Sequence, residues 1–274
     1  MERRAGCLRS YRRPPGAILA LQGCAARGDN TEFIDWKGMS TLKRILLVCL
    51  VLLFLGFSVA GYVFWSMGNV EFWESSIRNF EKADQAHPSK LGSIVFSGSS
   101  SILFWHTLAD DMKPLDVINR GFGGSQIAQV NHNVARIVIN YRPRAVVLYA
   151  GENDLAWPWS KSPETVFSDF RRFVETVHSQ LPGTWIYYIS MKPTPLRWSN
   201  WRTEQKTNKM IEDYSRSQDR VQFIDVSTAM LDAQGKPRHE LFRWDGLHMN
   251  AQVYALWTLI IRPVLLSRFG QTPP

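Results

Sequence analysis

The chain has 274 residues, of which 45% are hydrophobic and 20% are charged. This composition is typical of a globular protein and excludes collagen-like repeats and wholesale disorder. The formal net charge is +8, but residues 1–44 carry nine Lys or Arg against four Asp or Glu, so the remaining 230 residues have a net charge of only +3. A nearly balanced body offers no basic face, and we expect no nucleic-acid partner.

The basic tail over 1–44 begins with a stretch, residues 1–38, that is rich in Arg, Gly and Pro and lacks hydrophobic periodicity. Two interpretations stay open. Translation starts at Met1 and this stretch is a disordered tail, or translation starts at Met39. The second interpretation rests on the basic residues that closely follow Met39, which resemble the normal start of an exported protein.

An apolar run follows the tail. Residues 45–65 contain no charged side chain, and these 21 residues have about the length needed to cross a hydrocarbon core of roughly 30 Å. Lys43 and Arg44 directly precede the run, and positive charge favours the cytoplasmic side of a membrane. We therefore predict a transmembrane signal anchor over 45–66, with the N-terminal tail on the cytoplasmic side and the body of the chain on the periplasmic or extracellular side.

Two alternatives to the anchor stay open. The residues around Ala60 resemble the small-x-small cleavage site of a signal peptide, so the protein is alternatively secreted after cleavage near Ala60. The other alternative is a buried core helix, although core helices are rarely apolar all round. Residues 62–65 stay apolar and aromatic beyond the cleavage site, which favours an anchor that ends at a membrane interface.

The body begins with a polar linker over 67–90 that has helical character, and a domain over 91–270 follows it. In this domain, short apolar runs alternate with amphipathic patterns of helical period. Apolar runs rich in β-branched and aromatic residues are typical of strands in a parallel sheet covered on both faces. The predicted strands are 93–97, 116–119, 144–150, 185–190 and 221–226, and the predicted helices are 125–140, 163–181, 202–217 and 250–269, the last kinked or divided at Pro263.

The alternation of strands and helices indicates right-handed crossovers between parallel strands. We therefore predict an α/β fold: a three-layer α/β/α sandwich with a central, mostly parallel five-stranded sheet of the flavodoxin-like type, preceded by one N-terminal transmembrane helix. In such folds the functional residues lie in loops beyond the carboxyl ends of the strands.

Polar residues do follow the predicted strands. Three serines, 99–101, follow the first strand, and a glycine-rich stretch, 121–124, follows the second. Asn153 follows the third strand, and Asp245 and His248 come beyond the fifth. A serine becomes a nucleophile when a histidine removes its proton, and a nearby aspartate orients that histidine. Backbone amides at glycines and an asparagine side chain are suitable donors for the oxyanion that forms in acyl transfer.

Each feature alone has an ordinary interpretation. Serine and glycine loops are usually turns, and an aspartate before a helix is often only its N-cap. The glycines do not indicate a phosphate loop, because no Lys-Ser or Lys-Thr pair follows them. All four features in order, each on its expected loop, favour an enzyme.

Four sequence blocks resemble those of the SGNH (GDSL-like) hydrolase superfamily, which is named for its Ser, Gly, Asn and His. The blocks are GSS at 98–100, NRGFGG at 119–124, GEND at 151–154 and DGLH at 245–248. The resemblance covers about residues 91–268. The first block departs from the usual Gly-Asp-Ser, because Ser99 stands where the family more often has an aspartate, and serine can make fewer hydrogen bonds within the loop.

The resemblance implies a serine hydrolase. The implied catalytic residues are Ser100 as the nucleophile, His248 as the base and Asp245 as the partner of the histidine, and the implied oxyanion hole consists of Ser100, Gly124 and Asn153. The neighbouring serines at 99 and 101 stay open as alternative nucleophiles. The family acts without a metal, so we expect neither a metal site nor a cofactor.

Four further residues are predicted to contact the substrate because they fall near these loops. Trp157, Trp159 and Trp244 offer aromatic platforms for a sugar ring or an acyl chain, and Arg197 offers a cation for an anionic substrate group. The competing interpretations are core or lid packing for the tryptophans and a solvated charge for the arginine.

We therefore expect a carboxylic ester hydrolase, an acyl- or acetyl-esterase that forms an acyl-enzyme intermediate. Its partners would be the membrane, through residues 45–66, and a small-molecule, lipid or acetylated-carbohydrate ester. An acetyltransferase or deacetylase that acts on an envelope polysaccharide is the first alternative, because the exclusion of water decides between hydrolysis and transfer. A non-catalytic binding protein on the same fold is the second alternative, and the presence of Ser100, Asn153 and His248 argues against it.

Overall fold

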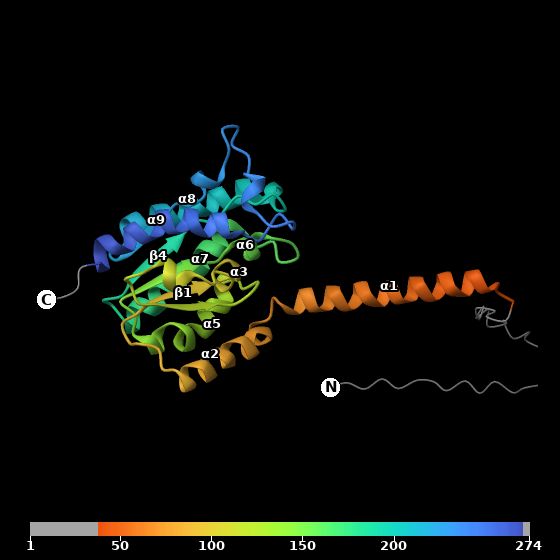
Figure 1. Ribbon diagram of the computed structural model, residues 1–274, viewed down its shortest axis with the longest axis horizontal. Helices are drawn as coiled ribbons and strands as arrows, with labels where there is room; N and C mark the ends of the chain where they lie inside the picture. Colours follow the sequence, from red (N-terminus) through yellow and green to blue (C-terminus); the bar gives the residue numbers. More distant parts are fainter. Residues whose placement is uncertain (1–37, 271–274) are drawn as a thin grey trace, which may run out of the picture. The chain divides into compact units, whose positions relative to one another are not determined.

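A five-stranded parallel sheet forms the centre of the protein in the computed structural model, which describes residues 38–270 (Figure 1). The strands lie in the order β2-β1-β3-β4-β5, and each neighbouring pair is parallel. This arrangement confirms the predicted flavodoxin-like sheet and places its topological switch point between β1 and β3. The strands are β1 Ile94–Gly98, β2 Val117–Gly121, β3 Ala145–Tyr149, β4 Trp185–Ile189 and β5 Val221–Ile224.

Helices cover both faces of the sheet and complete the three layers (Figure 1). One face packs against α2 (Glu74–Ala86), α5 (Ile127–Ile137), α7 (Pro163–Gln180) and α8 (Trp201–Ser217). The other face packs against α3 (Ser100–Leu103), α4 (Leu108–Asp111) and α9 (Ala251–Phe269). The remaining short elements of the body are α6 (Glu152–Leu155) and the 3₁₀ helices Val70–Trp73, Ile139–Tyr141, Trp198–Asn200, Thr228–Met230 and His239–Leu241.

The side chains of β1 explain why its sequence is apolar without interruption. Val95 belongs to the core on the α5 side of the sheet, whereas Ile94 and Phe96 belong to the core on the α9 side. Successive side chains of a strand point to opposite faces. Because both faces are covered, every position of the strand is buried, and its carboxyl end is held rigidly between its two neighbours.

Helix α9 corresponds to the predicted helix over 250–269, and Pro263 does not divide it. A proline inside a helix removes the hydrogen bond to the carbonyl four residues earlier. That carbonyl belongs to Leu259, whose side chain is exposed. The unpaired carbonyl therefore lies on the solvent side of α9, where water can satisfy it.

The segment 67–90 contains helix α2, which packs against α5. Ile77 is fully buried at this contact, and Arg136 of α5 pairs with Glu74 and Glu81 of α2, each at 2.6 Å. The hydrogen bonds from Arg136 and from a second arginine lower the pKa of Glu74 to about 2. Helix α2 is therefore part of the packed layer on this face of the sheet.

Helix α1 spans Thr41–Ser66, and none of its residues is buried. Within residues 38–270 it is the one helix whose length and composition suit a membrane crossing, a test that a signal sequence also passes. The chain divides into two compact units, Met1–Leu53 and Phe54–Pro274, so α1 contributes to both. The tail over 1–37, and with it the expected disorder or later translation start, lies outside the described residues.

Candidate active site

The serine loop follows β1 through a turn that only glycine can make. Gly98 has φ +129°, and a Cβ atom there would come within 1.9 Å of the Tyr149 carbonyl oxygen on the neighbouring strand. The Ser99 amide donates to that same oxygen at 2.9 Å. The chain then turns directly into α3, so Ser100 stands at the first position of a helix at the carboxyl end of the central strand.

The three serines differ in their surroundings. Ser99 and Ser101 are buried, and the hydroxyl of Ser101 accepts a hydrogen bond from Lys192 at 3.2 Å. Ser100 is half-buried, and its hydroxyl makes no hydrogen bond to any residue that the structure describes. Of the three, Ser100 therefore has the hydroxyl that a substrate can reach.

The predicted Asp-x-x-His block forms a compact turn in which Asp245 holds His248. One carboxylate oxygen, Oδ1, accepts from the backbone amides of Leu247 and His248, both at 2.9 Å, and the other, Oδ2, lies 2.6 Å from His248 Nδ1. Burial raises the pKa of Asp245, but these hydrogen bonds outweigh burial and lower it to about 2. An ionised Asp245 accepts a hydrogen bond from Nδ1, which leaves Nε2 of His248 as the basic nitrogen.

His248 meets the serine helix through an aromatic contact. Its ring packs edge-on against Phe104, with 5.3 Å between the ring centroids. Phe104 follows α3 directly, and its amide donates to the Ser100 carbonyl at 2.9 Å. The structure thus brings His248 to the helix that begins at Ser100, although the hydroxyl and the imidazole are not hydrogen-bonded to each other. Catalytic hydrogen bonds are often formed only when substrate is bound.

The glycine-rich loop over 121–124 lies against α3, the helix that begins at Ser100. Asn119, in the middle of β2, donates to the Ile102 carbonyl at 2.6 Å and accepts from the Gly121 amide at 2.9 Å. Gly124 adopts φ +70°, and a Cβ atom there would come within 2.5 Å of Met67 Cε. The Gly124 amide has no acceptor among the described residues, so it can donate to a substrate oxygen.

Asn153 lies beside the Gly124 loop. Its Nδ2 donates to the carbonyl of Ser125 at 3.0 Å, and its Oδ1 accepts from Arg197 Nη1 at 3.0 Å. The amide therefore keeps one N–H for a further acceptor. Together with the amides of Ser100 and Gly124, it forms a set of donors that suits the oxyanion of a tetrahedral intermediate.

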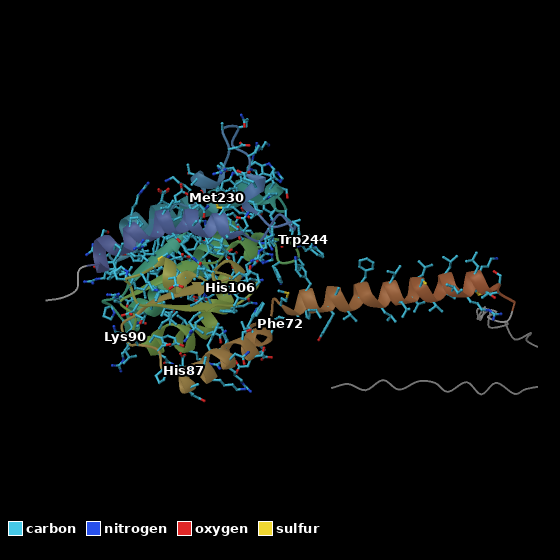
Figure 2. The ribbon with its side chains drawn as sticks, in the orientation of Figure 1. Phe72, His87, Lys90, His106, Met230 and Trp244 are labelled. Atoms are coloured by element: carbon cyan, nitrogen blue, oxygen red, sulfur yellow. The ribbon has the colours of Figure 1, made fainter. Side chains whose placement is uncertain are left out.

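The predicted substrate contacts have different surroundings. Trp244 is 98% exposed and Trp157 is 76% exposed, and Figure 2 shows Trp244 at the outer edge of the body. Trp159 is half-buried and packs against Phe64, with ring centroids 5.3 Å apart. Arg197 contacts Asn153, so one of its nitrogens already has a partner in the site.

A pair of residues that the sequence did not single out lies beneath the site. Lys192 and Glu152 form a buried ion pair, with 2.8 Å between Nζ and Oε2. Glu152 directly precedes Asn153, and Lys192 also contacts Ser101. The one signal in the sequence is the position of Lys192 in the loop just after a predicted strand, at the same edge of the sheet as the other site residues.

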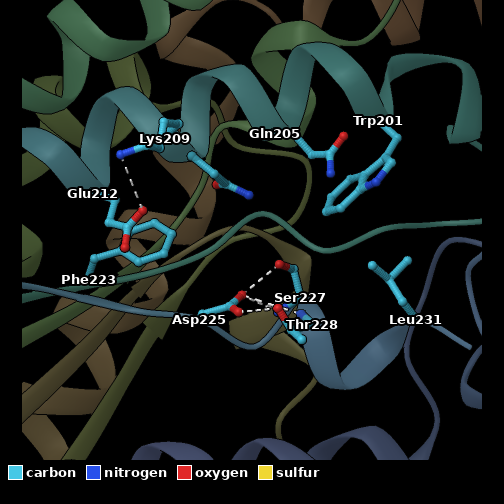
Figure 3. A pocket seen from close by; sticks show the side chains of 10 residues that line it. Trp201, Gln205, Lys209, Glu212, Phe223, Asp225, Ser227, Thr228 and Leu231 are labelled. Carbon is cyan, nitrogen blue, oxygen red and sulfur yellow. Dashed lines mark hydrogen bonds and ion pairs between the residues drawn. The ribbon is translucent and has the colours of Figure 1, made fainter. Parts of the chain in front are cut away.

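A separate cavity of about 250 Å³ lies between α8 and the segment after β5, and none of the predicted site residues lines it (Figure 3). Asp225 points toward Ser227 and Thr228 there and accepts hydrogen bonds from both. The lining of this cavity contains no histidine, the usual base for a serine nucleophile, and no cysteine. The chemistry therefore favours the loops beyond β1, β2 and β3 as the active site. No group of three or more His, Cys, Asp or Glu suited to a metal ion occurs within residues 38–270.

Comparisons with known proteins agree with this fold. A family model described as the GDSL-like Lipase/Acylhydrolase family matches residues 86–256. Among solved structures, the chain is similar to a GDSL-like lipase from Bacteroides thetaiotaomicron, with 21% identity and a TM-score of 0.59 over 73% of this chain and 98% of that chain.

Two further solved structures show the same fold. A carbohydrate esterase family 3 protein from Talaromyces cellulolyticus has 18% identity and a TM-score of 0.53, and the lipase/acylhydrolase from Enterococcus faecalis has 17% identity and a TM-score of 0.53. Each match covers 67% of this chain and 100% of the other. No curated protein sequence matches the chain.

Proposed function

The chain belongs to the GDSL-like lipase/acylhydrolase family, and from this premise we propose that it cleaves carboxylic esters through an acyl-enzyme intermediate on Ser100. One observation carries the proposal. His248 Nδ1 lies 2.6 Å from Asp245 Oδ2, and the His248 ring packs against Phe104, which directly follows the helix that begins at Ser100. This contact supports the assignment of Ser100 as nucleophile, His248 as base and Asp245 as the orienting carboxylate.

In the proposed first step, Ser100 Oγ attacks the ester carbonyl carbon while His248 Nε2 takes the hydroxyl proton. The carbonyl π electrons move to oxygen. The backbone amides of Ser100 and Gly124 and the side-chain amide of Asn153 stabilise the resulting oxyanion. When the tetrahedral intermediate collapses, the bond to the alcohol oxygen breaks and His248 gives its proton to the departing alcohol. The acyl group then remains on Ser100.

In the second step, His248 takes a proton from water as the water oxygen attacks the acyl carbon. The bond to Ser100 Oγ breaks, the serine recovers the proton from His248, and a carboxylic acid leaves. Asp245 stays ionised throughout, because its pKa is about 2, and it stabilises the imidazolium that forms in both steps.

Hydrolysis fits the site better than transfer to a second substrate. Ser100 and His248 are both half-buried, and Trp244 beside the histidine loop is 98% exposed, so water reaches the site in this conformation. An acyltransferase has to keep water away from its acyl-enzyme. The exposed rings of Trp157 and Trp244 suit the ring of an acetylated carbohydrate or the chain of an acyl ester as the bound part of the substrate.

We place the catalytic domain outside the cytoplasm, anchored through residues 45–66. The support is the length and apolar composition of α1 and the pair Lys43 and Arg44 on its N-terminal side. The acyl substrates would then be met on the periplasmic or extracellular side of the membrane.

The test is turnover of p-nitrophenyl acetate and longer acyl esters by full-length protein in detergent. We expect Ser100→Ala to lower kcat to background, a loss on the order of 10⁶-fold for a triad nucleophile. Ser179→Ala is the matched control, because Ser179 lies on the exposed side of α7 and contacts only the Thr176 carbonyl. Equal turnover by Ser100→Ala and wild type, or labelling of a different serine by a fluorophosphonate, would overturn the assignment.

A further inference from the structure

Lys192 is a buried cation that lies beneath the proposed active site. It lies in the loop after β4 and is 1% exposed, which is rare for lysine. Its ammonium group has three N–H donors, and each has an acceptor: Ser101 Oγ at 3.2 Å, Tyr149 OH at 3.0 Å and Glu152 Oε2 at 2.8 Å. Nζ also lies 5.1 Å from the centre of the Tyr149 ring.

Two of these acceptors are direct chain neighbours of proposed catalytic groups. Ser101 follows Ser100, and Glu152 precedes Asn153. Lys192 therefore connects the loop that carries the nucleophile with the loop that carries a side-chain oxyanion donor. The strands before these loops, β1 and β3, are neighbours in the sheet, but the lysine connects the loops beyond the point where the strands end.

We propose that Lys192 is a positioning residue, which keeps the Ser100 hydroxyl and the Asn153 amide in the geometry that ester hydrolysis requires. This inference rests on the proposed function. The hydroxyl and the amide have to act on two atoms of one carbonyl group, so their separation determines the rate. A cation with three fixed acceptors can set that separation, because any shift of either loop breaks a charge-assisted hydrogen bond.

The buried carboxylates around Lys192 do not favour the stability of the fold. Glu204 of α8 is fully buried. Within residues 38–270, neither of its carboxylate oxygens has a hydrogen-bond partner, and Oε1 of Glu152 also lacks one. Burial, with a further contribution from Glu152, raises the pKa of Glu204 well above its ordinary value. Apolar side chains in place of a buried ion pair are often neutral or stabilising, so a role at the site accounts for this cluster better than stability does.

A second contact holds Ser101 from helix α9, which covers the same face of the sheet as α3. Tyr254 of α9 donates from its hydroxyl to the Ser101 carbonyl at 3.1 Å. Ser101 is thus fixed through its main chain by α9 and through its side chain by Lys192. Removal of the lysine leaves the main-chain contact intact, so we expect a loss of alignment without loss of the fold.

The test compares two ion-paired lysines in full-length protein, the buried Lys192 and the half-buried Lys161. Lys192→Met removes the charge and the ammonium donors but keeps an unbranched side chain that is only one atom shorter. Lys161→Met is the matched control, because Lys161 also pairs with an acidic residue of the GEND block, Asp154 at 2.9 Å, and reaches Asp169 at 3.2 Å without touching the serine loop. For p-nitrophenyl acetate, we expect Lys192→Met to lower kcat about 10²-fold, the size of effect that a misplacement of about 1 Å can produce, and to leave KM within about threefold. Lys161→Met should keep kcat within about threefold of wild type.

The double variant Glu152→Gln with Lys192→Met separates positioning from charge compensation. It contains neither partner of the ion pair, so a purely structural role predicts that both Tm and kcat return to wild-type values. Positioning predicts that Tm returns while kcat stays low. Recovery of kcat in the double variant, or an unchanged kcat in Lys192→Met, would overturn the inference.

Hydrogen exchange gives a readout that does not depend on turnover. We expect the amides of residues 99–104 to exchange at least about tenfold faster in Lys192→Met, as expected when a local structure loses its support, and to be unchanged in Lys161→Met. Unchanged exchange in both variants contradicts the positioning role. Failure of the proposed ester hydrolysis can be distinguished from failure of the positioning role. In that case wild type itself would show no turnover, or Ser100→Ala would retain turnover.

Discussion

The Arg197 guanidinium donates from Nη1 to Asn153 Oδ1 at 3.0 Å, while Nδ2 of the same asparagine donates to the Ser125 carbonyl at 3.0 Å. Arginine can only donate and a backbone carbonyl can only accept, so the two contacts determine which end of the amide is oxygen and which is nitrogen. The remaining N–H of Asn153 is therefore fixed in direction before a substrate arrives. Arg197, which we expected to meet an anionic substrate group, hydrogen-bonds to Asn153, the proposed oxyanion donor.

We predict that Arg197→Met lowers kcat for a neutral ester about tenfold. The loss of an oxyanion donor costs about 10²–10³ in kcat, and the loss of its orientation should cost less. Arg202→Met on the exposed face of α8 is the control and should behave as wild type. The measurement is kcat and KM for a neutral and an anionic p-nitrophenyl ester. A rise in KM for the anionic ester alone, with kcat for the neutral ester unchanged, would contradict the orienting role and favour direct contact with the substrate.

A second prediction concerns Asp245. Asparagine at this position can still accept from the backbone amides, but it cannot stabilise an imidazolium and it favours the wrong tautomer of His248. We expect Asp245→Asn to lower kcat by about 10³–10⁴-fold while the protein remains folded. Steady-state kinetics with circular dichroism tests this, with Asp219→Asn on the surface as the control. A loss below tenfold would mean that the 2.6 Å contact between Oδ2 and Nδ1 has no catalytic role.

Much of this arrangement follows from local sequence patterns. The strands are short, continuously apolar and separated by amphipathic helices, so their number and their parallel pairing could be predicted before the structure was known. The position of Asn153 beside the Gly124 loop follows in turn, since polar residues just after parallel strands meet at one edge of the sheet. The contact of Asp245 with His248 is local, because the two residues are only three positions apart in the sequence.

The burial of Lys192 could not be predicted in this way. A lysine in a loop normally extends into solvent, and nothing in its own segment indicates otherwise. Its burial requires acceptors from three other elements, the serine helix, β3 and α6, which come together only in the tertiary structure. The contact of Arg197 with Asn153 is of the same kind, because 44 positions separate the two residues.

A third prediction concerns Gly124. The backbone there has φ +70°, which costs about 1–2 kcal/mol for a residue with a Cβ atom, and the added atom would come within 2.5 Å of Met67 Cε. We expect Gly124→Ala to lower Tm by several degrees and kcat by at least about tenfold, because the strained amide moves away from the substrate oxygen. Adding Met67→Ala should restore part of Tm by removing the clash, but kcat should stay low. Full recovery of kcat in the double variant would show that the clash alone, and not the direction of the amide, limits activity.

A fourth prediction concerns residues 45–66. If they anchor the protein, the full-length chain remains in the membrane fraction after an alkaline carbonate wash, and a peptide from this segment is recovered from it. Replacing Val51 and Leu55 by Lys should release the protein or prevent its insertion, because a charge at the centre of a membrane helix costs about 2.5–3.5 kcal/mol on insertion scales. A soluble mature protein whose first residue lies just beyond Ala60 would show that the segment is a cleaved signal.

The last prediction concerns Asp154, which is fully buried beneath the site. Its carboxylate accepts from the Ile127 amide at 3.2 Å and pairs with Lys161 at 2.9 Å, yet burial outweighs both contacts and raises the pKa to about 6 from an ordinary 3.8. The folded protein therefore binds this proton more tightly than the unfolded chain. The free energy of unfolding should fall as pH rises from about 4 to about 6. Above pH 6 the contribution of the Asp154 proton to this free energy should be lost.

Asp154→Asn removes this titration, so the stability of the variant relative to wild type should increase between pH 4 and pH 7. A shift of about two pKa units corresponds to roughly 3 kcal/mol at most. The measurement is Tm of both proteins in detergent at several pH values, with Asp219→Asn as a control whose difference from wild type should not vary over this range. A constant difference between Asp154→Asn and wild type from pH 4 to pH 7 would show that Asp154 is already ionised in the folded protein at pH 4, and that Lys161 compensates its burial.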